Sequence, residues 1–526
     1  MIWRTGSERR TISWITITVM VIVAYYVVQG INAYVFTIPS LKFGFILMGV
    51  LVALMWIPVF RWHAPSGERS TLLGSARLGA DHEVAALENG TGDLLVGRAV
   101  KSGKLLRQDG PAHLVTIAPT RSGKGVGTIL PNLLTIERAL VCIDPKGENA
   151  RVAAHARGKF GQVHCLDPFG VSGRPTARYN PLDRMDAGDI DLVDDVAALA
   201  DAIVQDDDAG GDATHWNEEA RALIAGVILH IVATEPLERR SLLTLREYLT
   251  LAPAGFSGLL EAMQGNPAVH GLVARAANRF LGKADREASG VLSAAQRHTH
   301  FLDSPRIADC IATSDFRFAD LRSGSVTIFL CLPPDRIDAY SRWLRLIVVE
   351  ALTALARTPA LPGRKPVLFL LDEFAALGRL EPVARAMGLI AGYGVQLWPI
   401  LQDIHQLRHL YGDRAGTFLA NAGVLQVFGV NDHDTADLIS KMIGEETVEY
   451  RSEGWSTNYG KDLIGSTTHG STVSEHATAR RLFTPDEIMR LGSDRQLLLR
   501  PGQAPLLTGR IVYYRDAEFV GKFDTV

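Results

Sequence analysis

The stretch 116-TIAPTRSGKGVG-127 follows a short apolar run at 113–117 that is typical of a strand, and we predict that a helix begins after it at Thr128. A loop at such a junction with the pattern G-x-x-x-x-G-K-[ST] binds nucleotide phosphates. Gly123 and Lys124 keep the end of this pattern, whereas Ala118 replaces its first glycine and Gly125 replaces its hydroxyl residue. The sequence therefore raises the question of whether this loop still holds a nucleotide.

The residues that remain are those that phosphate binding needs most. Backbone N–H groups at the positive end of a helix point at phosphate oxygens, and a lysine reaches the β- and γ-phosphates. Gly123 permits close approach and Lys124 supplies the charge. The alternative is an ordinary glycine turn with a surface lysine. The predicted nucleotide-binding residues are Thr120, Arg121, Ser122, Gly123, Lys124, Gly125 and Val126.

The glycine at position 125 leaves no hydroxyl to bind magnesium there. Ser122 and Thr128 are nearby substitutes. Alternatively, waters and an acidic residue elsewhere in the chain hold the ion.

A second motif, 366-PVLFLLDEFAALG-378, ends a buried strand in two adjacent carboxylates. Such a pair is costly to bury unless a cation or water meets it. In nucleotide hydrolases the first carboxylate holds Mg²⁺ and the second polarises the attacking water. We therefore predict that Asp372 is the metal ligand and that Glu373 is catalytic.

A third motif, 396-QLWPILQDIHQL-407, places Gln402 at the end of the next predicted strand. There it can sense the γ-phosphate or orient the water. The alternative for Gln402 is a polar residue that caps the following helix. The ordered series of glycine loop, Asp-Glu strand and Gln strand favours catalysis, with Lys124, Glu373 and Gln402 as the catalytic residues.

The order of predicted elements indicates an α/β fold in several parts. Strand-like and helix-like runs alternate from 65 to 182 and from 315 to 526, which is typical of a parallel sheet whose functional residues lie at the carboxyl ends of its strands. Residues 183–314 show only helical periodicity and are predicted to be an inserted all-α domain. Residues 452–475, rich in Ser, Thr and Gly, are predicted to be a loop.

Composition excludes some classes of protein. A hydrophobic fraction of 47% with 21% charged residues is typical of a folded chain rather than a disordered one. The formal net charge of -3 excludes a coat of basic residues, although not a local basic channel. The four cysteines form no C-x-x-C pair, so we expect reduced, buried thiols.

The first 64 residues are predicted to form a membrane anchor. Two apolar stretches without charged residues, 12–30 and 43–59, are long enough for transmembrane helices. Arginines flank the pair on its outer sides, whereas the connecting segment has only Lys42, so both termini are predicted to be cytoplasmic. The alternative, a cleaved signal peptide, lacks a cleavage site and leaves the second stretch unexplained.

Several of these motifs together resemble the type IV secretion coupling proteins, the TraG-like ATPases of conjugation. They are APTRSGKGVGTILPNLL, CIDPKGENA, LDPFG with YNPL, LFLLDEFAALG, ILQDIHQL and FGVNDHDTA. The resemblance covers nearly the whole chain. It implies a RecA-like motor, similar in core to FtsK-like translocases, that forms hexameric rings at the bacterial inner membrane.

The resemblance also implies cofactors, partners and residue roles. ATP and Mg²⁺ would be the cofactors, with Lys124 on phosphate, Asp372 on the metal, Glu373 activating water and Gln402 sensing the γ-phosphate. The partners would be the channel components and a relaxase with its single DNA strand, or effector proteins. Some relatives reach a neighbour's nucleotide with an arginine near 388–394. No arginine lies there, and the candidates are Arg342, Arg345 and Arg385.

Three rival functions stay open at this point. The same motor could handle effector proteins only, or the chain could be a membrane scaffold that does not hydrolyse nucleotide. A chromosome-segregation pump usually carries more transmembrane spans and a winged-helix DNA reader, and neither is found in the sequence.

Overall fold

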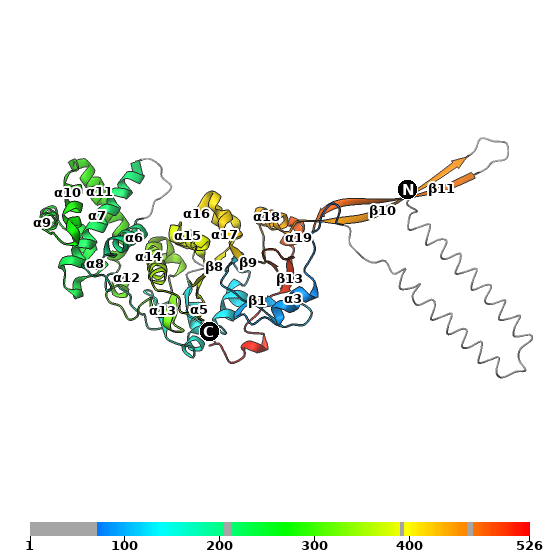
Figure 1. The fold of residues 1–526 in the computed structure, drawn as a ribbon, viewed down its shortest axis with the longest axis horizontal. Coiled ribbons are helices and arrows are strands. Elements are labelled where there is room, and N and C mark those ends of the chain that lie inside the picture. Colours follow the sequence, from blue (N-terminus) through cyan, green and yellow to red (C-terminus); the bar gives the residue numbers. More distant parts are fainter. Residues whose placement is uncertain (1–70, 205–211, 390–393, 460–466, 526) are drawn as a thin grey trace, which may run out of the picture. The chain divides into compact units, whose positions relative to one another are not determined.

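The computed structural model describes residues 71–204, 212–389, 394–459 and 467–525, all within the compact unit Thr71–Val526. A sheet of eleven strands runs through this unit (Figure 1). In spatial order its strands are β2 (Leu105–Gln108), β1 (Leu94–Arg98), β13 (Leu506–Gly509), β12 (Arg495–Leu499), β9 (Ala422–Val427), β3 (His113–Ile117), β8 (Val395–Leu401), β7 (Val367–Leu371), β4 (Leu140–Ile143), β6 (Thr327–Leu330) and β5 (Val163–Leu166).

The seven strands from β9 to β5 are all parallel to one another, which confirms the predicted α/β fold. All five residues of β7 and all four of β4 are buried. Continuous apolar runs such as VLFLL form these strands because helices cover both faces of a parallel sheet. The strands β12, β13, β1 and β2 extend the sheet with antiparallel pairs.

The parallel pairing brings motifs that are distant in sequence to one edge. Ile117 is in register with Leu401, Leu371 with Pro399, and Ile143 with Leu371. The segments that follow β3, β7, β8 and β4 therefore start side by side. This edge is where function is expected in an open α/β sheet.

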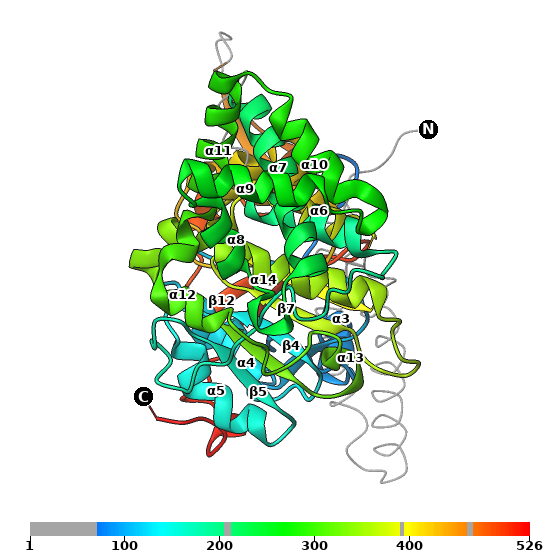
Figure 2. The ribbon, with the colours of Figure 1, turned by 90° about the vertical axis from the view of Figure 1, so that its left-hand side faces the viewer.

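Between β5 and the short helix α13 (Asp320–Ser323) that precedes β6, the regular secondary structure of the described chain is helical. These helices, here called the helical segment, gather together next to α14 (Figure 2). They are α6 (Leu192–Ile203), α7 (Asp212–Thr234), α8 (Leu242–Leu249), α9 (Pro253–Gln264), α10 (Leu272–Leu281), α11 (Asp285–Thr299) and α12 (Pro305–Cys310). The domain boundaries at 183 and 314 stay a prediction.

Helices elsewhere in the described chain lie beside the sheet or cap its ends. They are α3 (Asp81–Glu88), α4 (Leu130–Leu133), α5 (Glu148–Gly158), α13 (Asp320–Ser323), α14 (Ile337–Arg357), α15 (Glu381–Leu389), α16 (Ile404–Tyr411), α17 (Ala415–Ala420), α18 (His433–Ile443) and α19 (Pro485–Met489).

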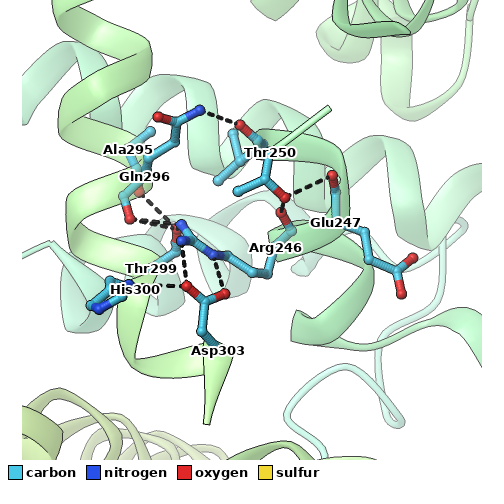
Figure 3. A network of polar contacts seen from close by, with 9 residues as sticks. Arg246, Glu247, Thr250, Ala295, Gln296, Thr299, His300 and Asp303 are labelled. Carbon is cyan, nitrogen blue, oxygen red and sulfur yellow. Dashed lines mark hydrogen bonds and ion pairs between the residues drawn. The ribbon is translucent and has the colours of Figure 1, made fainter. Parts of the chain in front are cut away.

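A polar network holds three elements of the helical segment together (Figure 3). Arg246 of α8 makes a two-point ion pair with Asp303, through Nε to Oδ1 at 2.7 Å and Nη2 to Oδ2 at 2.6 Å. The Nη1 atom of Arg246 also donates to the carbonyl of Gln296 in α11 at 2.7 Å. The hydrogen bond from Arg246 lowers the pKa of Asp303. The pair thus ties α8 to α11 and to the turn that follows it.

A second network joins the helical segment to α14. Glu350 of α14 accepts hydrogen bonds from Tyr179 at 3.2 Å and from Arg184 at 3.3 Å. Arg184 also pairs with Asp195 of α6 at 3.2 Å, and Asp195 pairs with Arg357 at the end of α14. Alternating charges therefore cross the contact between α6 and α14.

The prediction of a loop at 452–475 is wrong for most of that range. This region forms an antiparallel ribbon of β10 (Glu445–Tyr459) and β11 (Thr467–Arg481), in which Glu445 is paired with Arg481 and Gly454 with Thr472. Ser and Thr are common in loops, but Thr is also a β-branched residue that favours extended backbone. Composition alone therefore does not distinguish a loop from a strand.

The localisation prediction is corrected. Both predicted transmembrane stretches, 12–30 and 43–59, lie outside the described residues. Across the residues that the structure does describe, every helix is too short or too polar to cross a bilayer. The prediction of a multi-pass inner-membrane protein is therefore wrong on this finding. The four cysteines are free and buried, as expected.

Candidate nucleotide site

The loop after β3 is folded tightly against the sheet. Ala118 donates its N–H to the carbonyl of Leu401 at 2.8 Å, which fixes the start of the loop beside β8. Arg121 and Gly123 both have positive φ, 63° and 84°. This conformation suits glycine and is unusual for arginine. The backbone therefore makes two sharp reversals before Lys124.

The helix after the loop begins earlier than predicted. A π-helical turn, η1 (Gly125–Ile129), starts directly after Lys124 and continues into α4, so the helix does not start at Thr128. Gly127 suits this tight start, because a Cβ atom placed on it would be 2.9 Å from the carbonyl oxygen of Ile511. The loop's N–H groups consequently lie at the positive end of a helix, as phosphate binding requires.

The predicted catalytic and metal residues lie together. The Nζ atom of Lys124 is 2.7 Å from Glu373 Oε1 and 3.4 Å from Asp372 Oδ1. The Nε2 atom of Gln402 donates to Glu373 Oε2 at 2.9 Å. These contacts join residues 249 and 29 positions apart in the sequence. Their individual roles stay predictions.

Glu373 is held in an unusual backbone conformation, with φ 49°. It lies two residues after the end of β7 and is the N-cap residue of the turn η6 (Phe374–Leu377), and its side chain accepts a hydrogen bond from Lys124. Burial acts to raise the pKa of Glu373, but the hydrogen bond and charge of Lys124, together with Gln402 and Lys146, lower it overall. Glu373 is therefore stabilised as a carboxylate.

The pKa of Asp372 is raised, in contrast to that of Glu373. Burial raises its pKa, and the charge of Glu373 adds to this, although Lys124 partly offsets both. Asp144, at the end of β4, also has its pKa raised by burial, to about 7, with the charge of Asp372 contributing. Two carboxylates that are costly to ionise in the absence of a cation thus lie at adjacent strand ends.

These carboxylates fit Mg²⁺, which typically takes one or two carboxylates together with waters and substrate phosphates. Within the described ranges no cluster of three or more His, Cys, Asp or Glu side chains could enclose a metal. A phosphate-assisted site therefore suits Asp372 better than a closed protein cage does.

The two predicted hydroxyl substitutes for Gly125 are engaged elsewhere. Thr128 is fully buried and its hydroxyl donates to Gln426 Oε1 at 3.1 Å, so it does not lie in the site. Ser122 lies in the loop, but its hydroxyl donates to the carbonyl of Pro119 at 2.6 Å. This favours the third possibility, an ion held by waters and carboxylates.

The alternative reading of Gln402 as a helix cap is not what the structure shows. The cap of α16 is the next residue, Asp403, whose side chain accepts from the N–H of Gln406 at 2.9 Å. The side chain of Gln402 instead donates a hydrogen bond to Glu373.

The remaining predicted residues differ in exposure. Thr120 and Arg121 are exposed at the tip of the loop, whereas Gly125 and Val126 are half-buried. Among the candidate trans arginines, Arg385 is exposed on α15. Arg345 is 6% exposed and donates to the carbonyl of Arg379 at 3.0 Å, so it is placed for a contact inside the chain.

Comparison with known proteins agrees with this geometry. Residues 78–524 match the sequence pattern of the family described as type IV secretory system, conjugative DNA transfer. The chain belongs to this family. The predicted resemblance to type IV secretion coupling proteins is thereby confirmed.

Two relatives match most of this chain. It is 31% identical to the conjugal transfer protein TraG of Escherichia coli over 411 residues, which is 74% of this chain and 64% of that protein. It is 29% identical to Protein VirD4 of Rhizobium radiobacter over 421 residues, 79% of this chain and 59% of that protein. The match thus spans less than two thirds of each relative's length.

The fold is shared with solved coupling proteins. TrwB in complex with the ATP analogue ADPNP has a TM-score of 0.64 and 17% identity, covering 85% of this chain and 96% of TrwB. TrwB in complex with ADP and Mg²⁺ has a TM-score of 0.61 and 18% identity, covering 83% of this chain and 94% of TrwB.

Sequence reasoning missed several groups near the candidate nucleotide site. Asp144 and Lys146 lie in the motif CIDPKGENA, which contributed to the family resemblance without a role for either residue. Arg510 lies against the loop but gave no local signal, because it comes from the far end of the chain. Phe428, which contacts Arg510, opens the motif FGVNDHDTA, which contributed to the resemblance without a role for this residue.

Proposed function

We propose that this protein is an ATP hydrolase that couples single-stranded DNA and its relaxase to a type IV secretion channel. The family and the relatives named for conjugal transfer support the coupling role. The convergence of Lys124, Asp372, Glu373 and Gln402 at one edge of the sheet supports hydrolysis and is the observation on which the proposal depends.

ATP and Mg²⁺ are the proposed cofactors. The TrwB complexes with an ATP analogue and with ADP and Mg²⁺ support them by shared fold. Asp372 and Asp144 would hold the ion, directly or through water. When bound, Mg²⁺ neutralises charge that develops on the phosphates during transfer.

The chain's own residues then have distinct tasks. The loop N–H groups bind the phosphates, and Lys124 exchanges its present carboxylate partners for the β- and γ-phosphate oxygens. Glu373, freed from Lys124, orients and polarises the attacking water. Gln402 holds Glu373 in place and detects whether the γ-phosphate is present, because its amide already contacts that carboxylate.

Assembly and substrate contact belong to the same proposal. The active form would be a ring, with a neighbour's arginine completing the site, and Arg385 is our candidate for it because it is exposed. Release of the γ-phosphate contacts would shift loops that face the DNA. Contacts to single-stranded DNA would be mainly to phosphates, hence independent of sequence and sensitive to salt.

The test is ATP turnover by the purified chain, with and without single-stranded DNA. Glu373→Gln should lower turnover at least a hundredfold, the scale of a lost general base, while nucleotide still binds. Lys124→Ala should lose both binding and turnover. Lys101→Ala, an exposed lysine whose side chain is 79% exposed, serves as the control.

The outcomes separate the rival functions. If the unaltered chain shows no turnover, the motor is replaced by a non-hydrolysing scaffold. If Glu373→Gln turns over ATP as fast as the unaltered chain, Glu373 loses its catalytic role. Turnover stimulated by effector proteins and not by DNA would favour a coupling protein for protein cargo only.

A further inference from the structure

Arg510, the residue after β13, lies against the phosphate-binding loop. A Cβ atom placed on Gly123 would be 2.7 Å from Arg510 Nη2, and one on Gly127 would be 3.5 Å from the same atom. The glycines of the loop and of the first helical turn therefore face this guanidinium group. The absence of side chains at both positions lets it approach the backbone.

Two contacts hold the guanidinium group at this position. Its Nη1 atom donates to the carbonyl of Ser493 at 2.8 Å. Its Cζ atom lies 4.1 Å from the centroid of the Phe428 ring, a close cation–π contact. Phe428 itself follows β9 and donates its N–H to Ile117 at the end of β3, at 3.3 Å. The cation is thus fixed relative to the start of the loop.

The charge of Arg510 is not matched by an acidic partner. None of the carboxylates in the described ranges makes an ion pair with it, and its buried Nε atom has no hydrogen-bond partner there. Burial lowers the pKa of Arg510, whereas the charge of Asp494 acts to raise it. Arginine nevertheless stays charged in proteins. A half-buried cation of this kind is stabilised when an anion binds beside it.

We propose that Arg510 binds a phosphate oxygen of the nucleotide, from the side of the loop formed by Gly123 and Gly127. This inference rests on the proposed nucleotide-binding function. The Nη2 atom is the group available for the contact, because Nη1 is already used by Ser493. The nucleotide would then be bound by two cations, Lys124 from the loop and Arg510 from the C-terminal strands.

Affinity for a fluorescent ADP derivative with Mg²⁺ tests the proposal on the purified full chain. Arg510→Gln should weaken binding about tenfold or more, the scale of one charge-assisted hydrogen bond. Arg510→Lys, which keeps the charge but not the planar guanidinium group, should lose less affinity for ADP than Arg510→Gln does. Arg515→Gln, an exposed arginine of the same segment, should bind ADP like the unaltered chain.

The results distinguish this inference from the function on which it rests. If the unaltered chain does not bind ADP, the nucleotide function itself fails. If it binds and Arg510→Gln binds equally well, only the role of Arg510 is refuted. If Arg510→Gln unfolds, Arg510→Met replaces it, because methionine keeps the packing on Phe428 without the charge. Weaker ADP binding by Arg510→Met would support the role of Arg510, and unchanged ADP binding would refute it.

Discussion

The ion network between α6 and α14 predicts that Arg184→Ala destabilises the protein. The side chains of Glu350 and Asp195 are only 2% and 5% exposed, and Arg184 contacts both. Removing one partner of a buried ion pair costs about 3–5 kcal/mol. Arg184 is 33% exposed, Asp195 keeps Arg357, and Glu350 keeps Tyr179, so we expect about 2–3 kcal/mol.

Unfolding by urea, followed by circular dichroism and tryptophan fluorescence, measures this loss. Arg178→Ala, which removes an exposed pair with Asp315 at 3.6 Å, is the control and should cost less than about 0.5 kcal/mol. Adding Glu350→Gln to Arg184→Ala should recover part of the loss, because the amide is neutral. A loss no larger than the control's, or strict additivity in the double variant, would refute a coupled buried network.

The same variant should show a defined pH dependence. Burial raises the pKa of Glu350, whereas Arg184 acts to lower it. Without Arg184 the folded chain therefore binds a proton more readily than the unfolded chain does. Its stability should fall as the pH rises from the ordinary glutamate pKa, about 4.3, through the raised one, so the deficit is smallest in acid.

Two further predictions concern the site and the helical segment. Gln402→Ala should lower ATP turnover in steady-state hydrolysis about a hundredfold, because Glu373 loses its amide partner, and should leave the affinity for ADP unchanged. Weaker ADP binding would instead make Gln402 a binding residue. Asp303→Asn should cost about 1 kcal/mol in unfolding experiments. Since the pKa of Asp303 is lowered, the stabilisation that its carboxylate gives is present above about pH 3.9 and declines as the pH falls below it. If the free energy of unfolding of Asp303→Asn falls with acid in the same way as that of the unaltered chain, this prediction is wrong.

The parts of the site that the sequence predicts are those carried by local pattern. A run such as VLFLL with Asp372 and Glu373 at its end indicates a buried strand and its carboxyl edge, and the loop with Lys124 indicates a second strand end. Because parallel strands end at one edge, their meeting follows from the fold class. The contact of Lys124 with Glu373 is the geometric result of that rule.

Other features depend on contacts that no local pattern contains. Arg510 reaches the loop across 387 positions in the sequence, through an antiparallel extension of the sheet. Thr128 is suitable in chemistry but points to Gln426, because the helix starts three residues earlier than its pattern indicates. The ribbon of β10 and β11 has loop-like composition, and its register is set by pairing between the two strands.

The position of α14 has a mechanical consequence. Near its middle, Arg345 donates to the carbonyl of Arg379, just beyond the turn that follows Glu373, and at its end Arg357 pairs with Asp195 of α6. These two anchor points are about 18 Å apart along a stiff α-helical rod. A displacement of the turn that follows Glu373 would therefore be transmitted along α14 to the helical segment as the movement of a rigid body.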